Sequence, residues 1–287
     1  MRGFRTISEY AGAYEAGRTH WCSFRKAPSQ ASIAGWWSDL SMVAGNPKAN
    51  FYASTPLTSA VLDGFDGIFH GADKSPSSMH LASWGITTPT AGFVGRFTMC
   101  DYLLYYPFID GDETSTQTLT NTVSLPRYTD GEGVMVMAVC VAPTLGGGAF
   151  TFDYINQAGL PKTSPVQTLS LTAANIGSIA TSQPATTGNG PFCKLASGDT
   201  GVRSITAVNV STPGGGLICL VLVKPLSDLM IWEINTMSEI EYVSKRIGAP
   251  QIYDGAYLNL ICNTPATIAA GLMTGYASFV WSDPNAF

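Results

Sequence analysis

Apolar runs separated by short turns dominate the second half of the chain. Residues 202–210 and 217–223 are rich in Val, Ile and Leu, and the break between them contains Pro213 and three glycines. A Gly/Pro break between two such runs predicts a β-hairpin. The run 217–223 is apolar at every position, which is typical of a central strand that is buried on both faces.

The same pattern occurs further upstream. Residues 134–141 are entirely apolar, three glycines end the following loop, and residues 150–156 alternate between bulky and polar side chains. We therefore predict a second hairpin that pairs these two runs. Further strands are predicted at residues 119–125, 166–171, 230–234, 257–262 and 276–281.

Two short helices are also predicted. The first begins at a capping box made by Thr6 and Glu9, and the second has the same signal at Ser238 and Glu241 and ends before Gly248. The first helix carries a narrow apolar stripe, which we expect to dock on the body of the protein or on a neighbouring subunit. The stripe consists of Ile7, Tyr10 and Tyr14.

Many short strands with little helix favour a mainly β fold. We predict a β-sandwich of jelly-roll type with two short helices and an extended N-terminal region. Residues 1–118 are expected to form an N-terminal arm that wraps the body, with a short helix and edge strands, and residues 119–287 the β-sandwich domain.

The chain is poor in charge. Charged residues make up 12% of the sequence, about half of the roughly 25% that is usual in soluble domains. A neutral exterior favours a subunit that buries its surface against others, although a Ser/Thr-rich surface is an alternative explanation. The net charge of −5 and the scattered basic residues argue against a nucleic-acid partner.

No segment suggests a membrane partner. The apolar runs are much shorter than the roughly 20 residues needed to span a bilayer. The N-terminus lacks the apolar core of a signal peptide, so we expect assembly in a cytoplasm. Six cysteines are present without the close spacing of a zinc site, and buried free thiols are expected.

The adjacent tryptophans Trp36 and Trp37 raise the possibility of sugar stacking. Because neighbouring residues of a strand point to opposite faces, the two rings cannot form one platform, and a core or interface role is favoured. The C-terminal Phe287 could anchor in a neighbouring subunit. The predicted interface residues are Ile7, Tyr10, Tyr14, Trp36, Trp37 and Phe287.

Metal binding is not predicted. His70 could pair with Asp66 or Asp73 on a metal ion, but histidines in loops are more often ordinary polar residues. The acidic run 110–113 lacks the downstream ligands of a calcium loop and is interpreted as a solvated turn. We expect no metal and no other cofactor.

Enzymatic activity is not predicted either. The chain has no G-x-S-x-G motif, and no histidine follows residue 119. Two carboxylates can meet from anywhere in a fold, so a glycoside hydrolase would need partners such as Asp101, Asp153 and Glu233. Isolated carboxylates on strands are more often surface groups or hydrogen-bond acceptors.

Two passages resemble a known class of proteins. Residues 152–159 (FDYINQAG) and 198–204 (GDTGVRS), followed by LVKP at 222–225, are similar to structural proteins of tailed-bacteriophage virions. The resemblance covers roughly residues 133–281 and includes no catalytic motif. It implies a capsid- or tail-associated subunit of the virion that is assembled in the host cytoplasm, with other virion proteins, such as major capsid or tail subunits, as partners.

We therefore expect a non-enzymatic virion structural protein, a capsid decoration or minor capsid subunit that forms homo-oligomers. A carbohydrate-binding receptor or spike module and a polysaccharide-degrading hydrolase are the alternatives.

Overall fold

The fold is mainly β, as the sequence pattern predicts. A computed structural model describes residue 4 and residues 6–28, 32–183, 190–243, 248–267 and 271–283. Within these residues the chain forms one α-helix, three short 3-10 turns and sixteen strands. All pairings between these named strands are antiparallel.

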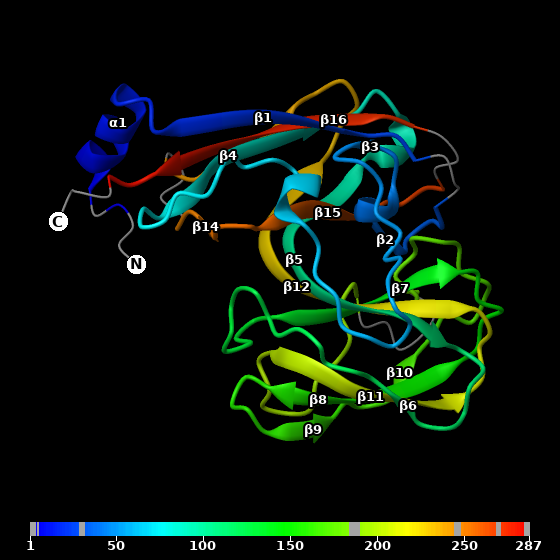
Figure 1. Cartoon of the computed structure of the whole chain (residues 1–287). Coiled ribbons are helices and arrows are strands. Elements are labelled where there is room, and N and C mark those ends of the chain that lie inside the picture. The colour runs from blue at the N-terminus through cyan, green and yellow to red at the C-terminus, as the bar shows by residue number, and fades with distance from the viewer. Residues whose placement is uncertain are drawn as a thin grey trace.

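Three sheets are stacked from top to bottom in Figure 1. The upper sheet has the order β13 (Ser238–Glu241), β4 (Met79–Thr87), β16 (Met273–Trp281), β1 (Thr19–Lys26) and β3 (Gly45–Asn46), with β14 (Gln251–Ile252) paired to β4. The central sheet has the order β2 (Trp37–Asp39), β15 (Tyr257–Asn263), β5 (Gly95–Asp110), β12 (Leu217–Ile231) and β7 (Met135–Ala142). The lower sheet has the order β10 (Gln167–Thr168), β8 (Ala149–Asn156), β11 (Val202–Thr212) and β6 (Gln117–Thr118), with β9 (Pro161–Thr163) paired to β8.

The long strands β5 and β12 connect the two halves of the molecule. Near the start of β5, Phe97 and Met99 pack in the core beneath the upper sheet. Further along, Leu104 and Tyr106 pack in the core against the lower sheet. Register shifts interrupt the pairing of β5 with β12 at three points, and the pair curves in Figure 1. One curved ribbon can therefore cover two sheets.

The opposite face of the central sheet is covered by irregular segments. Tyr52, from the N-terminal part, and Ile179 pack there against strand residues such as Tyr102 and Val221. Burial on both faces confirms the prediction for residues 217–223, since β12 lies between β5 and β7 and residues 218–223 are buried.

The prediction that each pair of apolar runs forms a hairpin is wrong. Strand β7 pairs with β12 in the central sheet, whereas β8 pairs with β11 in the lower sheet. Strands β11 and β12 are likewise divided between these two sheets. In both cases the glycine-rich loop carries the chain from one layer to the facing one, so the successive strands share a core instead of hydrogen bonds.

The first predicted helix is present and the second is not. Helix α1 (Ile7–Glu15) begins at Thr6, whose side chain accepts a hydrogen bond from the Glu9 amide, and it packs through Ala13. Residues 238–241 form strand β13, which pairs with β4, because a free sheet edge is available to them. The end of the predicted second helix, residues 244–247, lies outside the described residues.

Other predicted elements differ in extent. The strand expected at 119–125 is wrong, because the short strand β6 ends at Thr118 and only an isolated bridge at Thr120 follows it. The strand expected at 166–171 is reduced to the two-residue strand β10, and of the strand expected at 230–234 only residues 230–231 form the end of β12. Residues 1–118 contribute strands β1 to β6, which are divided among all three sheets. Within the described residues, no helix has the length and apolar character needed to cross a membrane.

Candidate functional site

An exposed apolar patch lies at one end of the lower sheet, where three loops meet. Leu145 is 80% exposed and Leu171 is 57% exposed. The Leu145 amide donates to the Gly214 carbonyl at 2.8 Å, and the Gly147 amide donates to the Ser170 carbonyl at 2.6 Å. These bonds connect the loops before β8, after β10 and before β12. We call Leu145 and Leu171 the loop-tip patch.

Glycine permits the close approach of these loops. Gly146 has φ +97°, and a Cβ atom there would lie 2.8 Å from the backbone of Thr172. Such a conformation and such a distance exclude other residues. The two leucines are therefore displayed on a compact framework of loops, which lowers the entropy lost when a partner covers them.

Helix α1 supplies a second exposed apolar surface. Tyr10 packs with Phe4 on the cluster that contains Ala13, on the outer side of the upper sheet. Ile7 is 76% exposed and Tyr14 is 44% exposed. The predicted apolar stripe is thus divided, because the helix uses its small Ala13 side for docking and leaves Ile7 in solvent.

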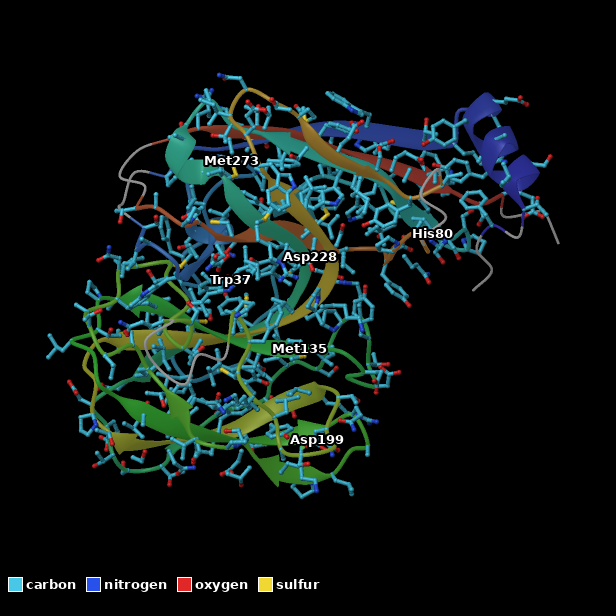
Figure 2. All side chains as sticks on the ribbon, turned by 180° about the vertical axis from the view of Figure 1, so that it is seen from behind. Trp37, His80, Met135, Asp199, Asp228 and Met273 are labelled. Atoms are coloured by element: carbon cyan, nitrogen blue, oxygen red, sulfur yellow. The ribbon has the colours of Figure 1, made fainter. Side chains whose placement is uncertain are left out.

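Trp36 and Trp37 are buried within the chain itself. Trp37 packs with Met42 and Ile179 against the central sheet, and it lies in the middle of the molecule (Figure 2). Trp36 packs beside Cys140 and Ala174. The expected interface at these two positions is therefore corrected, since both rings face the core and present almost no surface to a neighbour. Phe287 lies outside the described residues.

A buried carboxylate, Asp39, organises the N-terminal cover of the central sheet. It accepts hydrogen bonds from the hydroxyls of Tyr52 and Tyr102 and from the amide and hydroxyl of Ser41. Burial raises the pKa of Asp39, and these four donors oppose the rise. With four donors bound, the carboxylate is fully occupied as an acceptor. We interpret it as a structural anchor.

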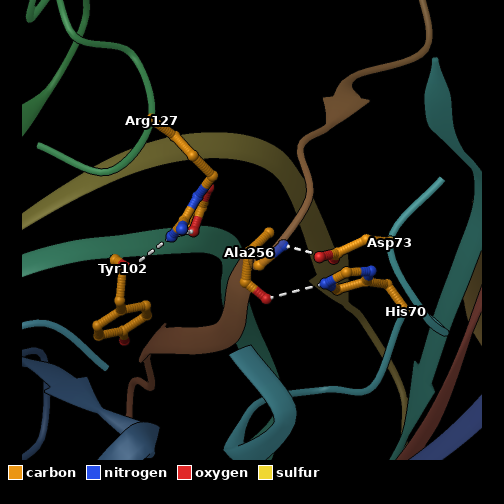
Figure 3. Close-up of polar contacts among 7 residues, drawn as sticks. His70, Asp73, Tyr102, Arg127 and Ala256 are labelled. Atoms are coloured by element: carbon orange, nitrogen blue, oxygen red, sulfur yellow. Dashed lines mark hydrogen bonds and ion pairs between the residues drawn. The ribbon is translucent and has the colours of Figure 1, made fainter. Parts of the chain in front are cut away.

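A second buried carboxylate, Asp101, is neutralised by an arginine. The Arg127 Nε donates to Oδ2 at 2.8 Å, and its Nη2 donates to Oδ1 at 2.7 Å. The same Nη2 donates to the Tyr102 carbonyl at 3.1 Å (Figure 3). Burial raises the pKa of Asp101, and the guanidinium opposes the rise. The pair fastens the loop around Arg127 to β5.

The histidine considered as a metal ligand is used differently. The His70 ring nitrogen Nε2 lies 3.1 Å from the Ala256 carbonyl, and Asp73 accepts from the Gly255 amide (Figure 3). Burial lowers the pKa of His70. Asp66 forms an ion pair with Lys48 at 2.8 Å. In the described part of the chain, no three His, Cys, Asp or Glu side chains are grouped as a metal site would require.

The three carboxylates considered for hydrolysis lie in different environments. Asp101 is in the core with Arg127. Asp153, on β8, accepts from the Thr163 hydroxyl in the lower sheet. Glu233 is exposed in the turn after β12. The fold therefore does not place any two of these three carboxylates on opposite sides of one cleft.

All six cysteines are free thiols, as the sequence predicts. Five are buried, and Cys22 is half-buried. Burial raises the pKa of Cys22 to about 11, which leaves this most accessible thiol protonated and unreactive near neutral pH.

Several exposed residues escaped the sequence analysis. Trp21 is 62% exposed and Trp232 is 79% exposed. The alternation of apolar and polar residues in 19–26 would have placed Trp21 on the outer face with Ser23 and Arg25. Leu145 carried no periodic signal, because it lies in a loop.

No protein-family model, no curated protein and no solved structure matches this chain.

Proposed function

We propose that this chain is a structural subunit of a tailed-bacteriophage virion, a capsid decoration or minor capsid protein that binds its neighbours through apolar, charge-poor surfaces. The observation that carries the proposal is the loop-tip patch. Leucines with 80% and 57% of their surface exposed, on loops held by backbone hydrogen bonds, are costly in a solitary protein. They become favourable when a neighbouring subunit covers them.

The charge distribution supports the same function. Fifteen basic and 20 acidic side chains share a surface of 11,685 Å², about one charge for every 330 Å². Two of the acidic groups, Asp39 and Asp101, are buried and add nothing to the exterior. A surface of this kind disfavours the solvated monomer and favours homo-oligomers or contacts with other virion proteins.

We also propose that the sandwich of β5, β12 and β7 on the lower sheet is of jelly-roll type. Its support is the path of the chain, which crosses between the two layers from β5 to β6, β6 to β7, β7 to β8 and β11 to β12. Repeated crossing between antiparallel layers is typical of Greek-key and jelly-roll folds. A crystal structure of the chain, compared strand by strand with known jelly rolls, tests this assignment. A strand order and connectivity that differ from those of jelly rolls would contradict it.

Sedimentation of the purified chain, alone and with capsids of the phage that encodes it, tests the assembly function. We expect concentration-dependent oligomers or co-sedimentation with capsids. The double variant Leu145→Asp/Leu171→Asp should weaken either association at least about tenfold, because a charge would be desolvated at the contact. Its melting temperature should change little, since both side chains are exposed.

Leu160→Asp is the matched control. Leu160 is 54% exposed but follows β8, at the other end of that strand from Leu145. It should leave association unchanged. A chain that stays monomeric at high concentration and ignores capsids would contradict the proposal, as would a Leu160→Asp effect equal to that of the double variant.

A further inference from the structure

The outer face of the upper sheet carries a row of aromatic and polar side chains that crosses four strands. Tyr276 on β16 lies opposite Ser23 on β1 and opposite Gly85 on β4. Gly85 in turn lies opposite Glu239 on β13. Trp21 is two residues from Ser23 on the same face of β1. We call Trp21, Tyr276 and Glu239 the aromatic track.

The members of the aromatic track hold one another in place. The rings of Trp21 and Tyr276 are stacked, with centroids 6.3 Å apart and planes inclined by 19°. The Tyr276 hydroxyl donates to Glu239 Oε2 at 2.9 Å. Trp21 still exposes 62% of its surface. The track is therefore ordered and remains open to solvent, as a preorganised binding surface requires.

Gly85 makes this arrangement possible. A Cβ atom at position 85 would lie 2.7 Å from Tyr276 Cε1 and 3.1 Å from Glu239 Cβ. The missing side chain lets the Tyr276 ring lie across β4 and reach the carboxylate on the next strand. Any larger residue would displace the ring or the carboxylate.

The track continues into a groove beyond Glu239. This groove has a volume of about 360 Å³ and is lined by Glu239, Ser238 and the exposed Trp232. Two exposed tryptophans thus lie on either side of one carboxylate. The span from β1 to β13 is about 14 Å at the usual strand spacing, which is about the length of three pyranose units.

We propose that the aromatic track binds a neutral oligosaccharide across the upper sheet. A pyranose ring has an apolar C–H face that stacks on an indole and hydroxyls at its edge that donate to a carboxylate. The track presents these two features in alternation. The inference goes beyond the assembly function, because it concerns a different surface from the loop-tip patch.

Area and geometry favour a sugar over other ligands. The two aromatic side chains of the track offer at most about 500 Å², well below the roughly 800 Å² that each partner buries in a stable protein interface. Aromatic cages for quaternary ammonium groups surround the cation with rings. The Trp21 and Tyr276 rings are nearly parallel and cannot surround it.

Isothermal titration calorimetry of the full chain with cellohexaose, mannohexaose, xylohexaose and chitohexaose tests the proposal. We expect saturable binding of at least one of them. Trp21→Ala should weaken it at least about tenfold. Glu239→Gln, which keeps the shape of an exposed side chain and so preserves the fold, should weaken it several-fold.

Phe65→Ala is the control. Phe65 is 69% exposed, but it lies in a turn that packs near β15 of the central sheet, away from the outer face of the upper sheet. It should bind like the wild type. No saturable binding of any of the four sugars would overturn the proposal, as would unchanged binding by both Trp21→Ala and Glu239→Gln. Competition by tetramethylammonium would also overturn it by indicating a cation site. Self-association and capsid binding test the loop-tip patch, so failure of sugar binding would leave the assembly proposal standing.

Discussion

The buried pair of Asp101 and Arg127 allows a sharp test of how the two halves of the fold are connected. Asp101 is 1% exposed, and Arg127 is 8% exposed. Three hydrogen bonds leave the guanidinium, two to the carboxylate and one to the Tyr102 carbonyl. Arg127→Met removes all three and leaves a carboxylate in the core without its counter-charge.

Removing one partner of a buried pair costs about 3–5 kcal/mol of unfolding free energy. At about 2–4 °C per kcal/mol for a chain of this size class, the melting temperature should fall by about 6–20 °C. Urea unfolding followed by tryptophan fluorescence, together with calorimetry, measures both quantities.

Two comparison variants sharpen this test. Arg96→Met breaks an ion pair with Asp228 whose side chains are 54% and 49% exposed, and it should cost at most about 1 kcal/mol. The double variant Asp101→Leu/Arg127→Met replaces the pair with apolar groups, and it should recover most of the lost stability or exceed the wild type.

The loss in Arg127→Met should also depend on pH. Without the guanidinium, burial raises the pKa of Asp101 above its unfolded value of about 3.9, so the folded state binds the extra proton. Stability of the variant relative to wild type therefore falls as pH rises from about 4 through the raised pKa. A loss below about 1 kcal/mol at neutral pH, or one that stays constant with pH, would refute this account of the pair.

Three further predictions concern other parts of the fold. Burial lowers the pKa of Lys26 to about 8, below its unfolded value of about 10.4. Between about pH 8 and pH 10.4 the folded state therefore binds fewer protons than the unfolded state. The stability of the wild type relative to Lys26→Met, measured by urea titration, should rise over this pH range. Gly45→Ala should cost at least about 2 kcal/mol, because its Cβ would lie 2.0 Å from the Arg25 carbonyl oxygen. Gly17→Ala, with no atom within 4 Å, should cost less, and an equal loss would contradict the steric explanation. At neutral pH, Ellman's reagent should react only slowly with Cys22 and not with the five buried thiols in the native protein, and quickly with all six after denaturation. Rapid reaction of several thiols in the native protein would contradict their burial.

The candidate surfaces were partly visible in the sequence. Low charge and a helix with an apolar stripe indicated apolar side chains on the surface, and Ile7 and Tyr14 are exposed. Trp36 and Trp37 attracted attention as an adjacent pair, yet burial in the chain's own core removes both. Trp21 and Tyr276 come from opposite ends of the chain, and their stacking depends on the pairing of β1 with β16.

Local sequence determined where strands and turns occur, because burial on one or both faces of a strand leaves a pattern of period two or a continuous apolar run. The run 217–223 was predictable as a central strand on these grounds. Tertiary structure alone decided which strands pair. A glycine-rich loop after an apolar run can return the chain beside the same strand or carry it to the facing sheet, and both paths bury the same side chains. Here the second path was taken at both predicted hairpins. Strand β7 pairs with β12 and β8 pairs with β11, and these long-range pairings leave no signal in the local sequence.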